Sequence, residues 1–109
     1  MTKYLLLYRA PVSATDQMAN ATPESAQAGM DAWTTWAGKA GNAIVDMGSP
    51  VALATSLGAD RAPGDFIGGY SILEASSLDA LKALLDGHPH LQLDGAAIEV
   101  HEFMPIPGM

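Results

Sequence analysis

Residues 69–103 read GYSILEASSLDALKALLDGHPHLQLDGAAIEVHEF and join two alternating segments through one helical segment. From Gly69 to Ala75, successive side chains follow the two-residue period of a β-strand. The same period returns from Ile98 to Phe103, after the turn signal Asp94-Gly95. We therefore predict one strand at each end of this unit.

The middle of the unit has the pattern of a short helix. Ser76 and Asp79 have the spacing of a capping box, in which each side chain can satisfy a free backbone N–H at the helix start. The apolar positions that follow recur at helical intervals: Leu78, Leu81, Leu84 and Leu85. Gly87 suits the left-handed position just past a helix end. These features predict a helix of about three turns.

The segments before this unit supply its partners. Lys3 to Tyr8 is apolar on both faces, which is typical of a central strand covered on both sides. Residues 10–22 are polar and have no period, so we expect a long loop there. Thr22 as cap and Pro23 at the first position then open a helix that runs to Ala40. Its apolar stripe combines four residues: Ala26, Met30, Trp33 and Ala37.

Two shorter segments lie between the helices. Asn42 to Asp46 is apolar and predicts a strand, and the alternation from Val51 to Leu57 predicts another strand or a hairpin arm. The order strand, helix, strand, strand, helix, strand is that of a ferredoxin-like α+β sandwich, βαββαβ. A chain of 109 residues fits a single domain, residues 1–109.

Composition excludes several classes of partner. The formal net charge is −7, with only five Lys plus Arg, which argues against nucleic acid and anionic membrane surfaces. There is no cysteine, so a disulfide framework or a thiolate metal site is impossible, and we expect a cytoplasmic location. The apolar run near the N-terminus is too short for a signal-peptide core or a membrane span.

A sheet with both helices on one face leaves its other face uncovered. Leu5, Leu7 and Phe103 belong to strands of the predicted sheet and would contribute apolar area to that face. Apolar patches of this kind usually mark an interface. We therefore predict a homodimer in which sheet packs on sheet.

Five segments resemble the YCII-related proteins: residues 1–11, the helix with Trp33 and Trp36, GNAIVDMG at 41–48, GYSILEASSLDALKALLDGHPHL at 69–91, and AAIEVHEF at 96–103. The resemblance implies a dimeric α/β-barrel built on the ferredoxin-like fold. Most members of that family have no assigned activity, and their fold is similar to that of muconolactone isomerases and small cofactor-free monooxygenases.

The chain departs from this family at two places. Part of the family carries a histidine on the first helix that is proposed to pair with an aspartate on the next strand. Asp46 matches that aspartate, but the helix contains no histidine, so the dyad is absent. The Asp-Gly-Pro-Phe motif of one branch is also unmatched, because residues 61–66 read RAPGDF.

The three histidines all lie in the C-terminal unit, and two of them flank Pro89. His88 and His90 follow a helix end, where a cationic imidazole is favoured by the helix dipole. His90 is also a candidate general acid/base, because imidazole is suited to proton transfer near neutral pH. A metal site from this His-x-His pair lacks a third ligand and is the weakest alternative.

Other polar side chains have a structural and a chemical interpretation. Glu99 and His101 share one face of the last strand, so they can form an acid/base pair in the dimer cleft or an interfacial ion pair. Asp46 can cap a turn or point its carboxylate into a cleft, and Arg9 can bind an anionic substrate or pair with an acid. Trp36 and Tyr70 can line a pocket or pack in the core.

Together these residues predict a small-molecule site between the sheet and the first helix. In our main hypothesis the protein is a cofactor-free isomerase or lyase in which His90 is the general acid/base and Asp46 its carboxylate partner. The residues expected to position substrate are Arg9, Trp36, Tyr70, Glu99 and His101. No cofactor or metal motif is present in the sequence. The alternatives are a non-catalytic small-molecule binding or accessory protein, and a structural dimer with an empty cleft.

Overall fold

β1 (Thr2–Ala10) lies at the centre of a four-stranded antiparallel sheet with strand order β2-β3-β1-β4. The computed structural model describes residues 1–108. Its other helices and strands, in chain order, are α1 (Ala14–Asn20), α2 (Pro23–Ala40), the 3-10 turn η1 (Gly41–Ala43), β2 (Ile44–Asp46), β3 (Phe66–Ala75), α3 (Leu78–Leu85), the 3-10 turn η2 (Pro89–Gln92) and β4 (Ala97–Glu102). The expected α+β sandwich of ferredoxin-like order is therefore confirmed for the single chain.

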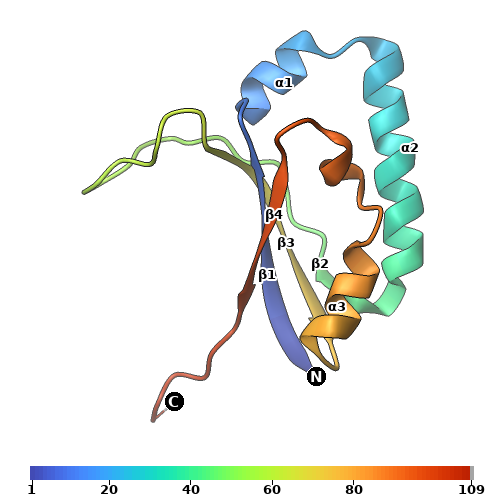
Figure 1. Ribbon diagram of the computed structural model, residues 1–109, viewed down its shortest axis with the longest axis vertical. Helices are drawn as coiled ribbons and strands as arrows, with labels where there is room; N and C mark the ends of the chain where they lie inside the picture. Colours follow the sequence, from blue (N-terminus) through green and yellow to red (C-terminus); the bar gives the residue numbers. More distant parts are fainter. Residues whose placement is uncertain (109) are drawn as a thin grey trace.

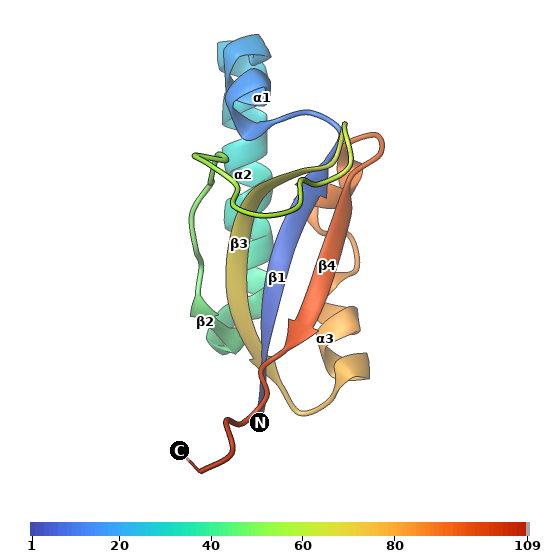
Figure 2. The ribbon, with the colours of Figure 1, turned by 90° about the vertical axis from the view of Figure 1, so that its left-hand side faces the viewer.

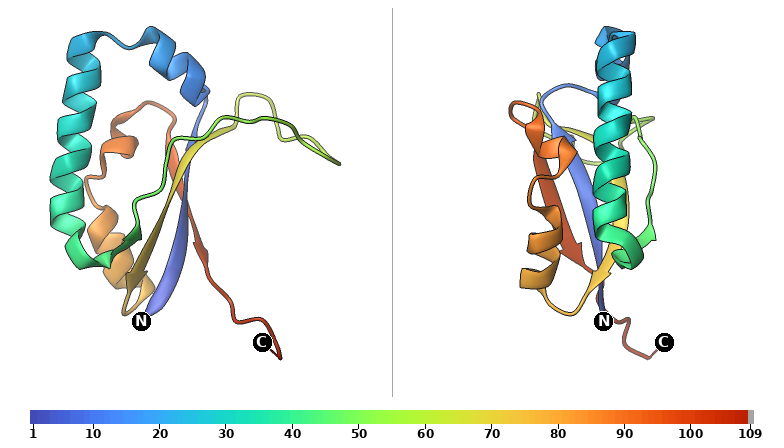
Figure 3. Two further views of the ribbon diagram at one scale, coloured as in Figure 1. Left: turned by 180° about the vertical axis from the view of Figure 1, so that it is seen from behind. Right: turned by 90° about the vertical axis from the view of Figure 1, so that its right-hand side faces the viewer.

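The helices cover one face of the sheet, as Figures 1 and 3 show. β1 alternates accordingly: Tyr4, Leu6 and Tyr8 are buried, whereas Leu5 and Leu7 are half-buried. We call the covered side the helix face. The opposite side, which Figure 2 views directly, is the open face; the strand residues on it include Leu5, Leu7, Arg9, Tyr70, Ile72, Glu99 and His101. Within the single chain, helices therefore cover one face of this strand, and the cover expected on its other face from a second copy stays a prediction.

The core forms where the helix face meets α2 and α3. Leu6, Leu73 and Leu81 are fully buried there, and Trp36 and Ala40 are the buried residues of α2. Each buried leucine side chain stabilises the fold by roughly 1.5–3 kcal/mol. The core is therefore concentrated around the C-terminal end of α2, next to α3.

Residues 10–22 do not form the expected continuous loop, because they contain α1. Ser13 caps this helix: its side chain accepts a hydrogen bond from the backbone N–H of Asp16 at 3.1 Å. None of the residues of α1 is buried, and residues 23–32 of α2 are all exposed. Capping hydrogen bonds, rather than burial in the core, thus stabilise the helical structure in this part of the chain.

The strand expected at Val51–Leu57 is wrong. The backbone pairs with β3 only at its start, where the N–H of Val51 donates to the carbonyl of Gly68 at 3.0 Å. Beyond it the chain projects from the open face as an arm, residues 51–64, and Leu53 and Leu57 are 75% and 92% exposed (Figure 1). Alternation without a neighbouring strand to supply backbone hydrogen bonds does not produce a strand.

The two helices predicted from the sequence, α2 and α3, begin close to their expected residues. Thr22 and Ser25 form a reciprocal capping box at the start of α2, and Ser77, rather than Ser76, caps α3 by accepting from the N–H of Ala80. Met30 is 65% exposed and does not belong to the core stripe. Gly87 has a φ of 71°, the left-handed conformation expected after a helix end.

Candidate functional site

A cluster of aromatic rings and two histidines lies between α2 and the helix face of the sheet. His88 is fully buried and His90 is 8% exposed. The sequence Gly-His-Pro-His explains their position, because Gly87 ends α3 with a left-handed residue and Pro89 starts η2 directly afterwards. This sharp connection holds both imidazoles under α2.

The hydrogen bonds of His88 define its tautomer. Its Nδ1 accepts a hydrogen bond from the backbone N–H of His90 at 3.0 Å. Nδ1 therefore carries no proton, and in a neutral imidazole the proton is on Nε2. Among residues 1–108, His88 Nε2 has no hydrogen-bond partner although it is buried. His88 thus presents an unused N–H donor inside the protein.

His90 has the complementary arrangement. Its Nε2 lies 2.8 Å from the carbonyl oxygen of Arg9, which can only accept, so Nε2 carries a proton. In the neutral ring Nδ1 is then the basic nitrogen, and no described residue donates to it or accepts from it. A backbone carbonyl therefore orients His90, in the role that the sequence analysis gave to the carboxylate of Asp46.

Aromatic rings surround His88. The ring centroid of Trp36 is 4.3 Å from that of His88, that of Trp33 is 4.7 Å away, and that of Tyr8 is 5.3 Å away. Tyr8 also contacts His90, with 5.2 Å between ring centroids. Trp36 is fixed by a hydrogen bond from its indole N–H to the carbonyl of Leu84 at 2.9 Å. The site is consequently buried and lined by flat rings.

Two hydroxyl groups extend the site across the sheet. The hydroxyl of Tyr8 donates to Ser71 Oγ at 2.8 Å, and the hydroxyl of Ser71 donates to the carbonyl of Met47 at 2.7 Å. Ser71 is fully buried. Because the carbonyl accepts only, it sets the direction of both donors.

Burial shifts the pKa of the His88 imidazole and that of the Tyr8 phenol. The pKa of His88 falls from 6.5 to about 4, first because burial penalises the cation and second because His90 lies nearby. Burial raises the pKa of Tyr8, and the hydrogen bond with Ser71 opposes that rise in part. His88 is therefore neutral near pH 7, which rules out a cationic helix cap at this position.

The open face carries a separate, charged cluster. Arg9 binds Asp65 through two hydrogen bonds, at 3.0 and 2.9 Å, and Glu99 through one at 3.1 Å. Asp65 also pairs with Arg61, and Glu99 accepts from His101 Nε2 at 2.6 Å. The expected pairing of Glu99 with His101 is therefore present, on the face opposite to His90.

Asp46 does not contact His90. Its carboxylate accepts a hydrogen bond from the backbone N–H of Gly48 at 2.8 Å and is exposed. β2 and β4 form opposite edges of the sheet, and η2 lies on the β4 side. Tyr70 lies on the open face beside Leu7. Of the candidate site residues from sequence, His90 and Trp36 each contact the central cluster, His90 through Tyr8 and Trp36 through His88, and Arg9, Glu99 and His101 form the separate charged cluster.

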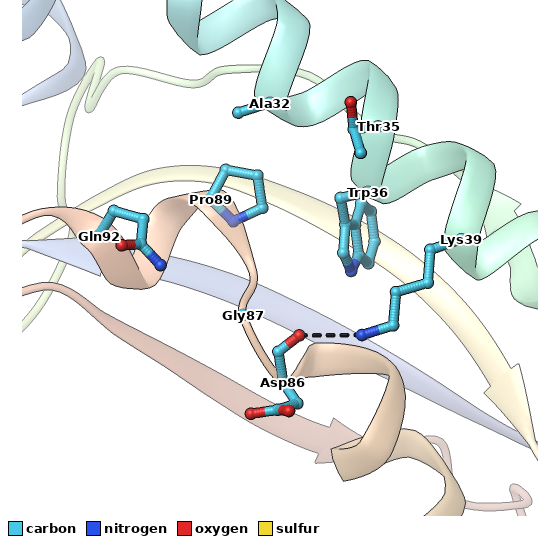
Figure 4. Close-up of a pocket in the computed structure, with 8 residues that line it drawn as sticks. All are labelled: Ala32, Thr35, Trp36, Lys39, Asp86, Gly87, Pro89 and Gln92. Atoms are coloured by element: carbon cyan, nitrogen blue, oxygen red, sulfur yellow. Dashed lines mark hydrogen bonds between the residues drawn. The ribbon is translucent and has the colours of Figure 1, made fainter.

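A surface pocket of about 340 Å³ opens on the far side of Trp36, between α2 and the turn after α3 (Figure 4). Its lining residues are Ala32, Thr35, Trp36, Lys39, Asp86, Gly87, Pro89 and Gln92. Lys39 crosses it to donate to the carbonyl of Asp86 at 3.0 Å. Trp36 thus separates this pocket from His88.

Within residues 1–108, no group of three or more His, Cys, Asp or Glu side chains is arranged to hold a metal ion. No helix in the same part of the chain is long and apolar enough to cross a membrane. Sequence reasoning gave His88 only a helix-capping or metal-binding role. One sequence signal could have indicated burial of His88. The residue lies between a glycine that ends a helix and a proline, and this sequence turns the chain sharply toward the core.

No protein-family model and no curated protein matches this chain. Among solved structures, it is similar to 5-chloro-2-hydroxyhydroquinone dehydrochlorinase from Burkholderia phenoliruptrix, in complex with 2,5-dihydroxybenzoquinone. The TM-score is 0.52 and the sequence identity 21%, over 94% of this chain and 93% of the other. The likeness is one of fold.

Proposed function

We propose that this protein is a cofactor-free enzyme of the lyase or isomerase type that transfers a proton on a small molecule. The observation that carries the proposal is the pair of complementary imidazoles: His90 offers a basic Nδ1 and His88 offers an N–H. Active sites commonly separate acid and base roles by giving two titratable groups different environments.

In the proposed reaction, His90 Nδ1 removes a proton from a carbon or hydroxyl group of the substrate. The imidazolium formed keeps its Nε2–H bonded to the carbonyl of Arg9, which stabilises the positive charge. An isomerase returns this proton to another atom of the substrate, whereas in a lyase a leaving group departs with the electron pair. The surrounding rings exclude water and strengthen these electrostatic interactions.

The similar structure guides the choice of first substrates. That protein is a dehydrochlorinase of 5-chloro-2-hydroxyhydroquinone, and its ligand is 2,5-dihydroxybenzoquinone. We therefore propose hydroxylated or halogenated ring compounds as the first class to test. The three aromatic rings and two imidazoles of the site support a small, flat substrate.

The test is to incubate the protein with 5-chloro-2-hydroxyhydroquinone and related halogenated hydroquinones while measuring chloride release and the absorption spectrum. Removing a general base typically costs about 10²–10⁴-fold in rate, so His90→Gln should lose that factor. Lys82→Gln, on the exposed surface of α3, is the matched control and should keep the wild-type rate. Equal rates in wild type and His90→Gln would refute the proposal.

A second candidate function is ligand binding without turnover. The full burial of His88 favours it, because a closed aromatic site can sequester a ligand as well as transform it. Saturable binding with no product formation, unchanged in His90→Gln, would support this candidate against the enzyme.

We also propose that two copies pair through the open face. Leu5, Leu7 and Ile72 supply apolar area there, and Phe103 is 47% exposed at its margin. A dimer would remove this area from water. Light scattering at micromolar concentration tests the pairing, and a monomeric mass would refute it. Membership of the YCII-related family and a cytoplasmic location stay predictions.

A further inference from the structure

We infer that His88 is a neutral hydrogen-bond donor that holds an oxygen atom of the substrate, and that the substrate is a flat ring bearing a carbonyl or enolate oxygen. This inference rests on the proposed function, because it assigns the substrate class of the same site. In this role His88 polarises the substrate oxygen, while His90 acts as the base.

The first argument is the unused donor. His88 is fully buried, its Nδ1 is occupied by the backbone N–H of His90, and its Nε2 has no partner within residues 1–108. The large majority of buried side-chain polar atoms in proteins are hydrogen-bonded, because leaving one unpaired destabilises the fold. A ligand oxygen that accepts from Nε2 would remove this cost.

The second argument is the charge of the group. Because burial holds the pKa of His88 at about 4, the ring donates as a neutral imidazole at pH 7. A neutral imidazole can polarise a carbonyl without losing its proton to the oxygen, as is known from other isomerases. An anionic enolate that forms when His90 removes a proton would strengthen the same hydrogen bond.

The third argument is the shape of the surroundings. Trp33 meets His88 edge-to-face at an interplanar angle of 87°, and Tyr8 meets Trp33 at 89°. Aromatic pairs prefer such edge-to-face or offset arrangements, so a further flat ring can replace one contact by another of similar energy.

Access to His88 requires one ring to move, and Trp33 is the least restrained. Trp36 is 4% exposed and donates to the carbonyl of Leu84, whereas Trp33 is half-buried and its indole N–H has no partner in the described part of the chain. Residues 23–32, which precede Trp33 on α2, are exposed and contribute no buried side chain. Segments with few buried contacts open at low free energy.

The decisive experiment uses the full wild-type chain, labelled with ¹⁵N in its histidine rings, and 2,5-dihydroxybenzoquinone as the probe. Two-dimensional NMR reports each ring nitrogen separately. We expect the proton on His88 Nε2 to move downfield on binding, as a new hydrogen bond to oxygen forms. 1,4-Dichlorobenzene, a flat ring without oxygen, is the matched control ligand and should cause no such shift.

Three variants give independent measurements, two of them by titration of tryptophan fluorescence. His88→Leu should bind 2,5-dihydroxybenzoquinone about 10-fold to 100-fold more weakly, as expected for one lost hydrogen bond to a charged oxygen. His88→Gln retains an N–H and should recover part of that loss. Trp33→Ala should speed association of the probe without weakening the shift of the His88 signal.

The outcomes separate this inference from the proposed function. Absence of binding, or binding that leaves the His88 Nε2–H signal unchanged, would overturn the role of His88. Turnover of a halogenated hydroquinone that depends on His90 would still support the enzyme in that case. Conversely, a shifted His88 signal without any turnover would retain the donor and refute the enzyme.

Discussion

Histidine side chains have contrasting environments on the two faces of the sheet. On the helix face, backbone groups set the tautomers of His88 and His90, and aromatic rings exclude water. On the open face, His101 is exposed and pairs with the carboxylate of Glu99, which Arg9 also holds. The first environment prepares neutral rings with fixed donors and acceptors. The second favours charge pairs that solvent and salt weaken.

The contrast predicts different costs for neighbouring leucines of β1. Leu6 is fully buried on the helix face, and Leu7 is half-buried on the open face. Leu6→Ala should lower the free energy of unfolding by about 2–5 kcal/mol, because it leaves a cavity in the core. Leu7→Ala, the matched variant, should cost less than about 1 kcal/mol in the monomer.

Urea denaturation at low protein concentration measures both leucine variants. In a dimer, Leu7→Ala should in addition weaken association, which light scattering across a concentration series detects. Equal losses of unfolding free energy in the two monomeric variants would show that the open face is covered within the single chain, contrary to this structure.

The buried imidazole predicts a pH dependence of stability. His88 has a pKa of about 4 in the folded chain and about 6.5 when unfolded, so the unfolded state binds more protons between these values. Stability should therefore fall as the pH decreases from about 6.5 to about 4, by roughly 3 kcal/mol from this residue. The loss is absent above about pH 6.5, where the ring is neutral in both states, and it is complete below about pH 4.

Chemical denaturation of wild type and His88→Phe at several pH values tests this expectation. Phenylalanine does not titrate, so the variant should lose less stability than wild type over the same pH range. Parallel curves for the two proteins would contradict a neutral, buried His88 in the folded state.

The smallest expected effect concerns Asp65, which ties the arm to the open face. The Arg9 guanidinium holds the pKa of Asp65 below its usual range, mainly through their hydrogen bonds, but both side chains are partly solvated. Asp65→Asn should hardly change the denaturation midpoint. It should instead speed cleavage by chymotrypsin after Leu53 and Leu57, measured by mass spectrometry. Ser56→Ala within the arm is the control, and equal cleavage rates in all three proteins would dismiss this tether.

The fold was accessible from the sequence because its strands and helices carry strong periods. The apolar run of β1 and the capped leucine repeat of α3 are local signals that the tertiary structure agrees with. α1 also had a local signal, since Ser13 and Asp16 have capping spacing, but its polar composition concealed it. The strand predicted at Val51–Leu57 was wrong for the opposite reason. The local alternation is strong there, but no adjacent strand is present to pair with it.

The candidate site was predictable only in part. The hypothesis of a site between the sheet and the helix ending at Ala40 agrees with the burial of His90 beside α2, but the expected partner of His90 was wrong. Asp46 lies at the end of β2, and sheet order places that strand at the edge away from η2. The actual partner, the carbonyl of Arg9, has no side-chain signature. Tautomers depend on such backbone contacts, which no residue pattern in a single sequence encodes.

The uneven placement of the core has a consequence for how this protein can change over evolutionary time. α1 and residues 23–32 of α2 contribute no buried side chain, yet they lead directly to Trp33 above the imidazoles. Mutations there should be nearly neutral for stability while altering what approaches the site. This segment can therefore accumulate substitutions that later allow new ligands to bind. Such substitutions need no compensating change elsewhere to keep the protein folded.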